Sequence, residues 1–437
     1  MTSSAETPAL NTLADSVKES AGTLQRLLTE EQLLQPSFSP TGRQDWSDAQ
    51  FIPAILAARS NLIDAAQMLV DLALGPTDIL AGYAGPCLSE IEVLRTLDSL
   101  GVADVVPLGG EISIPDLASK VGVRNVHAFE KQLRFAFLMG MFRRTPSGGV
   151  AHTALSAAIP VSSPYISLRL GRIFCQGGHE IPAALRNGAG KEGIPCALAD
   201  PEGLGRPAFV QLEDEPDGKG MERYSTGMIG LYNHHAGNSY LPFVHGFSWD
   251  SLSPGDTVVD VGGGNGHIEG QIVPLIPGVN FVIQDQPSNR EGAEKIIEEK
   301  GLAARVQYQP HDFFSPQPEL PGGRVPKVYT LFRVLQDWED ADAVRILKPL
   351  VPAMEKFGTE LWIMNRILPD ELNTMPRHSE RLLRNLDLVV FTLSGGGERS
   401  ASHMERMLKT ADERLTIKKS RRPLNSLFSF VEVSLEK

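Results

Sequence analysis

Apolar positions in the first third of the chain recur at the spacing of α-helices. Residues 11–34 and 52–75 each carry leucine, isoleucine, valine or alanine three or four positions apart, which predicts two amphipathic helices joined by a Pro/Ser/Gly-rich stretch. Residues 88–155 then show three helical segments followed by a strand, a turn around residues 147–149 and a second strand. Three helices and a hairpin in this order predict a winged helix.

The pattern changes beyond residue 245, where apolar, β-branched runs alternate with helical segments. The runs are TVVDVG, NFVIQD, VQYQPHDFF, KVYTLFRVL and ELWIMNRIL. This alternation predicts an α/β Rossmann-like domain, in which helices cover both faces of a parallel sheet. We therefore expect two domains. Residues 1–245 form a helical, winged-helix-containing dimerisation and substrate-lid domain, and residues 246–437 form the Rossmann-like domain.

One segment of the first domain differs in composition from its surroundings. Residues 186–222 are rich in glycine, proline and acidic side chains. Such a composition favours a long surface loop or a lid-like connection.

Charge narrows the choice of partners. The 437 residues carry a formal net charge of -12, whereas affinity for nucleic acid requires clustered lysine and arginine. The third helix of the predicted winged helix contributes only Lys131 and Arg134 among apolar side chains. The N-terminus lacks a secretory signal, no segment is apolar enough to cross a bilayer, and the three cysteines form no metal-binding pattern. We expect a cytoplasmic protein with a small-molecule ligand, no nucleic acid, no membrane and no metal.

A glycine-rich loop follows the first apolar strand of the second domain. Glycines let the backbone turn tightly and approach a ligand closely. The next strand ends in Asp285, which is placed to accept hydrogen bonds from ribose hydroxyls, and Asp260 before the loop suits the ammonium of an amino-acid cofactor. Asp312 and Phe313 follow the third strand and offer a carboxylate and an aromatic face to an adenine. The loop residues concerned are Asp260, Gly262, Gly263, Gly264 and Gly266.

Five ordered motifs together carry a family resemblance: the DxGxGxG loop, QDQP, PHDFF, LFRVLQDWEDADAVRIL and GGGERS. They resemble the fungal branch of the plant caffeate-type O-methyltransferase family, whose members pair a class I methyltransferase domain with a helical dimerisation half. The resemblance implies S-adenosyl-L-methionine as cofactor and a homodimer. It places the cofactor contacts on residues 262–264, Asp285, Asp312, Phe313 and Arg333, with Arg333 facing the cofactor carboxylate.

The chain departs from this family at the position of its catalytic base. Family members have a histidine directly before Asp-Trp, where this chain has Gln336. An amide cannot take a proton from a phenol, although it can donate and accept hydrogen bonds. Of the two supporting glutamates, Glu398 is retained and the other position is Asn365. Glu398 also allows a simpler interpretation, as a surface glutamate paired to the neighbouring Arg399.

These departures lead to three hypotheses. The first is a pericyclase of fungal secondary metabolism, related to the Diels-Alderase type. It cyclises a polyketide–amino acid 2-pyridone-type intermediate with the cofactor unspent, and Gln336 donates a hydrogen bond to a substrate carbonyl. The second is an O-methyltransferase acting on a phenolic or enolic polyketide, and the third a non-catalytic partner subunit. His179, His234 and His235 are open candidates for a second donor or a substitute base.

Overall fold

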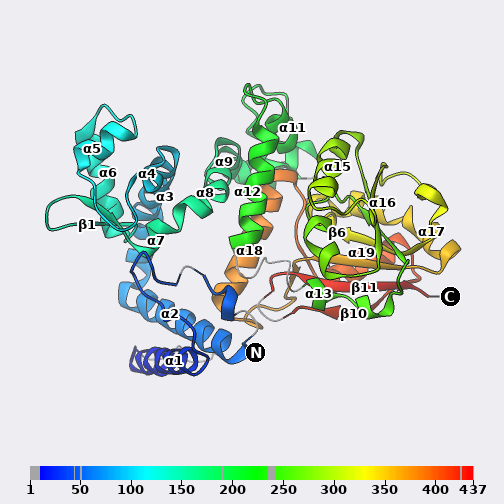
Figure 1. Cartoon of the computed structure of the whole chain (residues 1–437), viewed down its shortest axis with the longest axis horizontal. Helices are drawn as coiled ribbons and strands as arrows, with labels where there is room; N and C mark the ends of the chain where they lie inside the picture. The colour runs from blue at the N-terminus through cyan, green and yellow to red at the C-terminus, as the bar shows by residue number, and fades with distance from the viewer. Residues whose placement is uncertain are drawn as a thin grey trace. The chain divides into compact units, whose positions relative to one another are not determined.

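A computed structural model describes residues 10–43, 45–49, 52–188, 190–234, 243–423 and 426–436 (Figure 1). The chain divides into two compact units. The first comprises Met1–Cys175, Leu212–Ala236 and Pro376–His378, and the second Gln176–Gln211, Gly237–Met375 and Ser379–Lys437. This division differs from the predicted boundary after residue 245, because residues 176–211 pack with the sheet-containing unit.

The first unit is helical. Its described helices and strands are α1 (Leu10–Glu30), α2 (Pro53–Ala84), α3 (Pro86–Ser99), α4 (Val102–Val105), α5 (Ile114–Lys120), α6 (Val126–Leu138), β1 (Phe142–Arg144), β2 (Val150–His152), α7 (Ala154–Ala157), α8 (Ile159–Arg169) and α12 (Gly220–His234). Two further helices, α9 (Arg172–Asn187) and α11 (Ala208–Glu213), contain the unit boundaries.

The helices α3 to α6 and the ribbon β1–β2 follow one another in the order predicted for residues 88–155. The two strands pair antiparallel, with Phe142 opposite His152. Side-chain caps start two of the helices: Ser113 accepts from the Asp116 amide, and Asn125 accepts from the Ala128 amide. Buried residues from α3 to β2 form one apolar cluster, which holds these elements together.

The second unit is built on a seven-stranded sheet with the order β10-β11-β7-β6-β3-β4-β5. The strands are β3 (Thr257–Val261), β4 (Asn280–Asp285), β5 (Val306–Pro310), β6 (Pro326–Phe332), β7 (Glu360–Asn365), β10 (Leu415–Arg421) and β11 (Ser429–Leu435). The five strands from β3 to β7 are parallel, which confirms the predicted Rossmann-like sheet. The pairs β7–β11 and β10–β11 are antiparallel, an addition that the sequence pattern did not indicate.

The helices of the second unit are mostly short. They are α10 (Pro195–Leu198), α13 (Phe243–Gly246), α14 (Glu269–Ile272), α15 (Arg290–Glu299), α16 (Asp340–Leu347), α17 (Leu350–Phe357), α18 (Arg377–Ser394), which starts at the boundary, and α19 (Ala401–Ala411). A two-stranded parallel ribbon joins β8 (Ile367–Leu368) to β9 (Arg399–Ser400). None of the helices described anywhere in the chain is long and apolar enough to cross a membrane.

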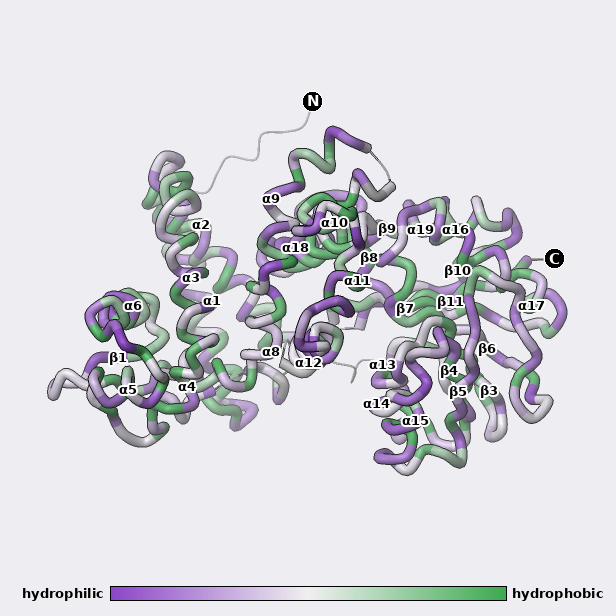
Figure 2. Tube along the Cα trace, turned by 90° about the horizontal axis from the view of Figure 1, so that it is seen from above, coloured by the Kyte–Doolittle hydropathy of each residue, from purple (hydrophilic) through white to green (hydrophobic). Residues whose placement is uncertain are grey.

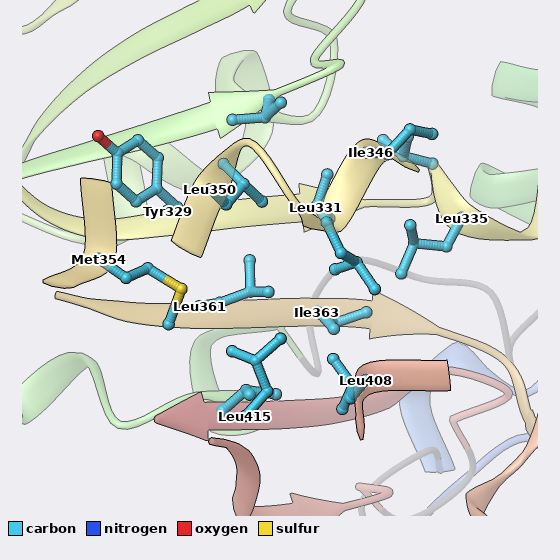
Figure 3. Packing of buried hydrophobic residues seen from close by; sticks show 14 of the residues in the cluster. Tyr329, Leu331, Leu335, Ile346, Leu350, Met354, Leu361, Ile363, Leu408 and Leu415 are labelled. Atoms are coloured by element: carbon cyan, nitrogen blue, oxygen red, sulfur yellow. The ribbon is translucent and has the colours of Figure 1, made fainter. Parts of the chain in front are cut away.

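The core of the second unit lies between the sheet and its helices. Figure 3 shows Leu361 and Ile363 of β7 packed among side chains of β6, α17 and α19. The tube in Figure 2 is hydrophobic over β7 and β11, as expected for strands covered on both faces. Trp362, between Leu361 and Ile363 on β7, points to the other face of the sheet and stacks on Phe247 at 5.0 Å between ring centroids.

The segment 186–222 is more ordered than the predicted surface loop. It contains α10 and α11, and Cys196 and Ala208 are buried. The buried Asp200 carboxylate pairs with the Arg206 guanidinium at 2.8 Å. Buried apolar and ionic groups of this kind fix a segment in place, so the composition alone misjudged it.

Candidate active site

The glycine-rich loop leaves β3 and forms a cradle. Gly262, Gly264 and Gly266 have positive φ values of 80°, 58° and 73°, which L-residues with a side chain rarely adopt. A Cβ at Gly262 would lie 2.8 Å from a Val334 methyl, and one at Gly263 would lie 2.6 Å from Asp260 Oδ2. At Gly264, by contrast, nothing lies within 4 Å, so this glycine borders open space. The loop therefore packs tightly on one side and presents bare backbone on the other.

Asp285 at the end of β4 is tied to this loop. Its Oδ2 accepts a hydrogen bond from the Gly264 amide at 2.8 Å, and its Oδ1 accepts from the Gln286 amide and from Asn289 Nδ2. Each carboxylate oxygen has two lone pairs, so Oδ2 retains capacity for a ribose hydroxyl. Asn289 belongs to this constellation and was not predicted, because its role depends on the turn after β4.

Two carboxyl groups lie buried beneath the loop. Asp260 Oδ1 accepts from Thr330 Oγ1 at 2.7 Å, and the carboxyl groups of Asp260 and Glu269 lie close enough to share a side-chain hydrogen bond. Burial raises the pKa of Asp260, and the nearby Glu269 carboxylate raises it further. Burial also raises the pKa of Glu269 to about 7. Such a pair favours a cation nearby.

Asp260 is buried behind the glycine loop. The residue is 0% exposed, so its carboxylate lies behind the glycine loop instead of at the loop surface. Because its raised pKa favours the protonated form, Asp260 shapes the loop from below, and its predicted contact with an ammonium group stays a prediction. Burial lowers the pKa of the adjacent His267 to about 4, so this imidazole adds no competing positive charge at neutral pH.

The loop after β5 supplies an aromatic wall. Phe313, Phe314 and Trp338 meet edge to face, with ring centroids 5.0 to 5.7 Å apart. A Cβ on Gly262 would lie 3.7 Å from Phe313, so this wall borders the glycine loop. Asp312 is exposed and accepts a hydrogen bond from the Phe314 amide at 3.0 Å. Phe313 therefore lies beside the cradle, and the contact of Asp312 with an adenine stays a prediction.

Gln336 is held by its amide nitrogen. Nε2 donates to the Arg333 carbonyl and to Asp337 Oδ2, both at 2.6 Å. A carbonyl oxygen can only accept, so the atom facing it must be the nitrogen. Gln336 is 2% exposed, and its Oε1 has no partner in the described part of the chain. The predicted donor role toward a substrate carbonyl is therefore wrong for this conformation, because both N–H groups are used and the atom left over is an acceptor.

Glu398 is the centre of a buried ion cluster. Its carboxylate lies 2.8 Å from Arg333 Nη1 and 3.1 Å from Arg366 Nη1, and its side chain is 0% exposed. The simpler interpretation as a surface glutamate paired to Arg399 is wrong, because Arg399 points away and pairs with Asp340. The lone pairs of the Glu398 carboxylate therefore face two guanidinium groups, which occupy the side chain.

Arg333 is part of the same buried ion cluster. Its φ is 61°, the left-handed region that a residue with a side chain occupies only when its surroundings hold it there. In this structure Arg333 Nη1 contacts Glu398, and the contact of Arg333 with a cofactor carboxylate stays a prediction. The contact between Arg333 and Glu398 could not be predicted from the sequence pattern, because the two residues are 65 positions apart and only the folded chain brings them together.

Asp337, which binds Gln336, and Asn365, at the end of β7, are two further polar groups of the second unit. Burial raises the pKa of Asp337 to about 6, against the opposing effect of the Arg333 charge. Asn365 is fully buried, and neither its Oδ1 nor its Nδ2 has a hydrogen-bond partner among the residues described. The site thus contains a titratable carboxyl, the uncommitted oxygen of Gln336 and the amide of Asn365, and the histidine of the family is absent from position 336.

The glycine-rich motif at residues 395–397 holds the segment that carries Gln336. A Cβ on Gly396 would lie 2.2 Å from the Gln336 carbonyl oxygen, so only glycine fits there. The Gly397 amide donates to the same oxygen at 2.9 Å. The sequence showed the motif, but its contact with residue 336 depends on the pairing of β8 with β9.

Two of the three histidines that the sequence offers as a second donor or substitute base lie among the described residues. His179 lies on α9 and is exposed, and His234 is the last residue of α12. His235 lies outside the described residues.

The cofactor contacts can be tested directly. We expect Asp285→Ala to weaken S-adenosylmethionine and S-adenosylhomocysteine alike, roughly a hundredfold, because both carry the ribose and each hydrogen bond to a carboxylate contributes about 1.5–3 kcal/mol. Isothermal titration calorimetry measures both affinities, with the exposed Glu291→Ala as control. Affinity within threefold of the unmodified chain would exclude Asp285 from the ribose site.

Comparison with known proteins agrees with this geometry. Residues 245–412 match the family described as O-methyltransferase domain. The O-methyltransferase aurJ of Gibberella zeae is 29% identical over 97% of both chains. The 6-hydroxytryprostatin B O-methyltransferase of Neosartorya fischeri is also 29% identical, over 92% of this chain and 95% of its own.

Solved structures share the fold over nearly the whole chain. The structure of OxaC in complex with SAH and oxaline is 20% identical, covers 98% of this chain and 99% of its own, and has a TM-score of 0.75. The LepI complex with SAM is 18% identical, covers 97% and 100%, and has a TM-score of 0.72. The resemblance and fold drawn from the motifs are thereby confirmed. The glycine cradle, Asp285 and the buried acids below the loop thus lie in a chain that resembles the fungal O-methyltransferases over nearly its whole length, and this resemblance supports S-adenosylmethionine as the cofactor.

Proposed function

We propose that this chain is a pericyclase of fungal secondary metabolism that binds S-adenosylmethionine without spending its methyl group. The reaction is a Diels-Alder or related cyclisation of a polyketide–amino acid 2-pyridone-type intermediate. One observation carries the proposal: the position of the family's base is Gln336, whose only uncommitted atom is an amide oxygen. Action in the cytoplasm on a polyketide-derived small molecule stays a prediction.

The proposal rests on the loss of a base for methyl transfer. A phenol has a pKa of about 10 and must lose its proton before it attacks a methyl group. An amide oxygen is too weakly basic to take that proton. Glu398 is bound by two guanidinium groups, and Asn365 is an amide, so neither replaces the histidine. General-base catalysis contributes roughly 10² to 10⁴ in rate, and neither Glu398 nor Asn365 supplies it.

A cyclisation needs orientation and a fixed electrostatic field instead of a base. Gln336 Oε1 can accept an N–H or O–H of the substrate, and the amide is held rigid because both its N–H groups are bound. The Arg333–Glu398–Arg366 cluster is preorganised and nearly dry, with Arg366 only 2% exposed. When bound at the glycine cradle, the cofactor supplies a fixed positive charge at its sulfonium.

Variants at Gln336 test the proposal. We expect Gln336→Ala to slow cyclisation of a 2-pyridone-type intermediate roughly tenfold to a hundredfold, since one hydrogen bond to the substrate and the anchoring of the segment are lost. Gln336→His restores the family's base and should give measurable methyl transfer. Product analysis by mass spectrometry follows both reactions, with the exposed Gln25→Ala as control. Unchanged cyclisation in Gln336→Ala would contradict the proposal.

The second candidate is O-methylation with Asp337 as base. It is favoured by the raised pKa of Asp337, about 6, and by the relatives that are named O-methyltransferases. The carboxylate accepts a proton only when ionised, so methyl transfer would increase as the pH rises through about 6. Asp337→Asn would then abolish methyl transfer, whereas it would leave a cyclisation that needs no base largely intact.

We further propose a homodimer formed through α2 and α3. Large apolar side chains on these helices are 41 to 67% exposed, more than an isolated soluble surface normally shows together. These are Val70, Leu72, Leu74, Leu80, Tyr83, Leu88 and Ile91. A second copy would bury them on both chains at once.

Light scattering after size-exclusion chromatography tests the dimer. We expect Leu80→Asp combined with Leu88→Asp to yield a monomer, because two charges would be buried in an apolar interface. Leu372→Asp changes an equally exposed leucine of the second unit and serves as the control. A dimer that survives the double substitution would exclude this surface, and a complex formed only with a different chain would favour the partner-subunit hypothesis.

A further inference from the structure

Arg399 occupies an unusual position for a charged residue beside the candidate site. It is the first residue of β9, which pairs in parallel with β8, and it is only 3% exposed. A buried guanidinium must direct its donors at acceptors, because an unpaired buried charge is strongly unfavourable. The identity of those acceptors shows what the residue holds.

The donors of Arg399 reach two carbonyl oxygens that flank Gln336 and Asp337. Nη1 donates to the Leu335 carbonyl at 2.7 Å, and Nη2 donates to the Trp338 carbonyl at 2.8 Å. The guanidinium is planar and rigid, so it fixes the separation of the two carbonyls it binds. Between these two points the chain makes the short turn that carries the Gln336 side chain.

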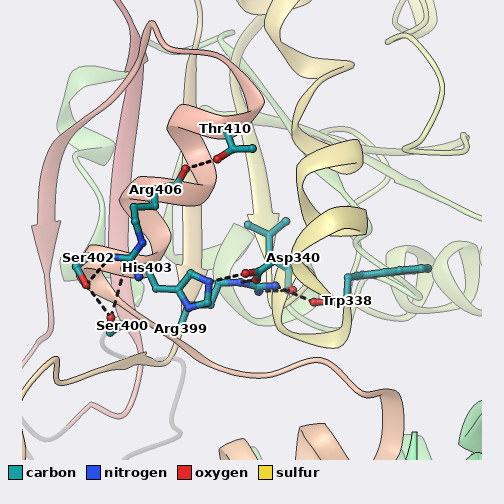
Figure 4. Close-up of polar contacts among 9 residues, drawn as sticks. Trp338, Asp340, Arg399, Ser400, Ser402, His403, Arg406 and Thr410 are labelled. Carbon is teal, nitrogen blue, oxygen red and sulfur yellow. Dashed lines mark hydrogen bonds and ion pairs between the residues drawn. The ribbon is translucent and has the colours of Figure 1, made fainter. Parts of the chain in front are cut away.

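Contacts with Asp340, and through it with His403, orient the Arg399 guanidinium. Its Nε donates to Asp340 Oδ1 at 2.9 Å, and His403 Nε2 lies 2.6 Å from Asp340 Oδ2 (Figure 4). Asp340 begins α16 and His403 lies on α19, so the clamp is anchored to two helices. Three fixed contacts leave the guanidinium no alternative orientation.

We infer that Arg399 is a positioning residue of the active site, which clamps the backbone on both sides of Gln336 and Asp337 and so aims their side chains. This inference rests on the proposed function for its catalytic consequence, but the clamp itself is independent of which reaction occurs. Lysine keeps the charge of Arg399 yet offers one nitrogen in place of a rigid fork. Arg399→Lys therefore removes the clamp and retains the charge.

Hydrogen–deuterium exchange of the full-length chain tests the clamp without a substrate. We expect Arg399→Lys to raise amide exchange roughly tenfold in the peptide covering residues 333–340, since local opening becomes easier. Exchange in β3, β4 and β6 should stay unchanged. Arg406→Lys, an exposed arginine on α19, is the matched control. Unchanged exchange in residues 333–340 would overturn the inference whatever reaction the protein catalyses.

Turnover then tests the consequence for catalysis. We expect Arg399→Lys to lower kcat about tenfold or more with the affinity for S-adenosylmethionine retained. In a Gln336→Ala chain the same change should cost less than about twofold, because Arg399 acts through Gln336. Equal losses in both backgrounds, or no loss despite raised exchange, would overturn the positioning role. If the unmodified chain gives no cyclisation at all, the proposed function fails while the exchange result still decides the clamp.

Asp340→Asn tests the same clamp if the Arg399→Lys chain does not fold. Asp340 is largely exposed on its side-chain atoms, so Asp340→Asn is tolerated by the core. It weakens the anchor of Arg399 and should raise exchange in residues 333–340 about threefold. No change in that peptide would contradict the inference as well.

Discussion

Glu398→Ala is expected to destabilise the chain by about 3–5 kcal/mol, the cost of leaving buried charges without their partner. The Glu398 carboxylate lies within 3.1 Å of both Arg333 and Arg366, and its side chain has no exposure to water. Removing it leaves two guanidinium groups close together in a nearly dry site. Urea unfolding followed by circular dichroism measures the free energy of unfolding.

The control for this substitution lies on α19. Glu405 is exposed, so Glu405→Ala should change stability by no more than about 0.5 kcal/mol. Glu398→Gln keeps the shape of the side chain and should fall between the two. A loss below about 1 kcal/mol in Glu398→Ala would show that the ion cluster is solvated and contributes little to stability.

Gly396→Ala is expected to cost about 1–3 kcal/mol and to reduce activity as well, because the added methyl group collides with the segment that carries Gln336. The new Cβ would lie 2.2 Å from the Gln336 carbonyl oxygen and 2.9 Å from the Trp338 nitrogen. The segment must move, and the Gly397 hydrogen bond to the Gln336 carbonyl is lost with it. Thermal unfolding measures the first effect, and product formation measures the second.

Gly178→Ala provides a matched comparison. A Cβ at Gly178 meets nothing within 4 Å, and this glycine lies inside helix α9. Alanine is favoured over glycine in a helix by about 1 kcal/mol, so this variant should be at least as stable as the unmodified chain. If Gly396→Ala and Gly178→Ala were equally stable, the backbone of residues 336–338 could shift away from residues 395–397 at little cost in free energy.

Local features of this chain could be predicted from its sequence. The alternation of apolar strands and helices after residue 245 predicts the parallel sheet, because each strand is a run of apolar, β-branched residues that can be recognised locally. The glycine loop and Asp285 were recognised because their roles depend on short-range geometry at the ends of β3 and β4. The antiparallel strands β10 and β11 and the buried core of residues 186–222 required contacts that periodicity does not encode.

Long-range polar contacts account for the errors at the site. The sequence allows an ion pair between Glu398 and its neighbour Arg399. In the fold, Glu398 pairs instead with Arg333 and Arg366, 65 and 32 positions away. Gln336 was expected to donate, but the Arg333 carbonyl and Asp337 consume both N–H groups. Residue identity shows which hydrogen bonds are possible, and only the fold shows which remain for a substrate.

The fate of the cofactor methyl group tests the central claim most directly. The purified chain is incubated with methyl-labelled S-adenosylmethionine, in amounts well below those of a 2-pyridone-type substrate, and the label is followed through product and cofactor. We predict many turnovers of cyclised, unlabelled product per cofactor molecule, with the labelled cofactor recovered intact. Label in the product, accompanied by an equal amount of S-adenosylhomocysteine, would contradict the account and identify the chain as a methyltransferase.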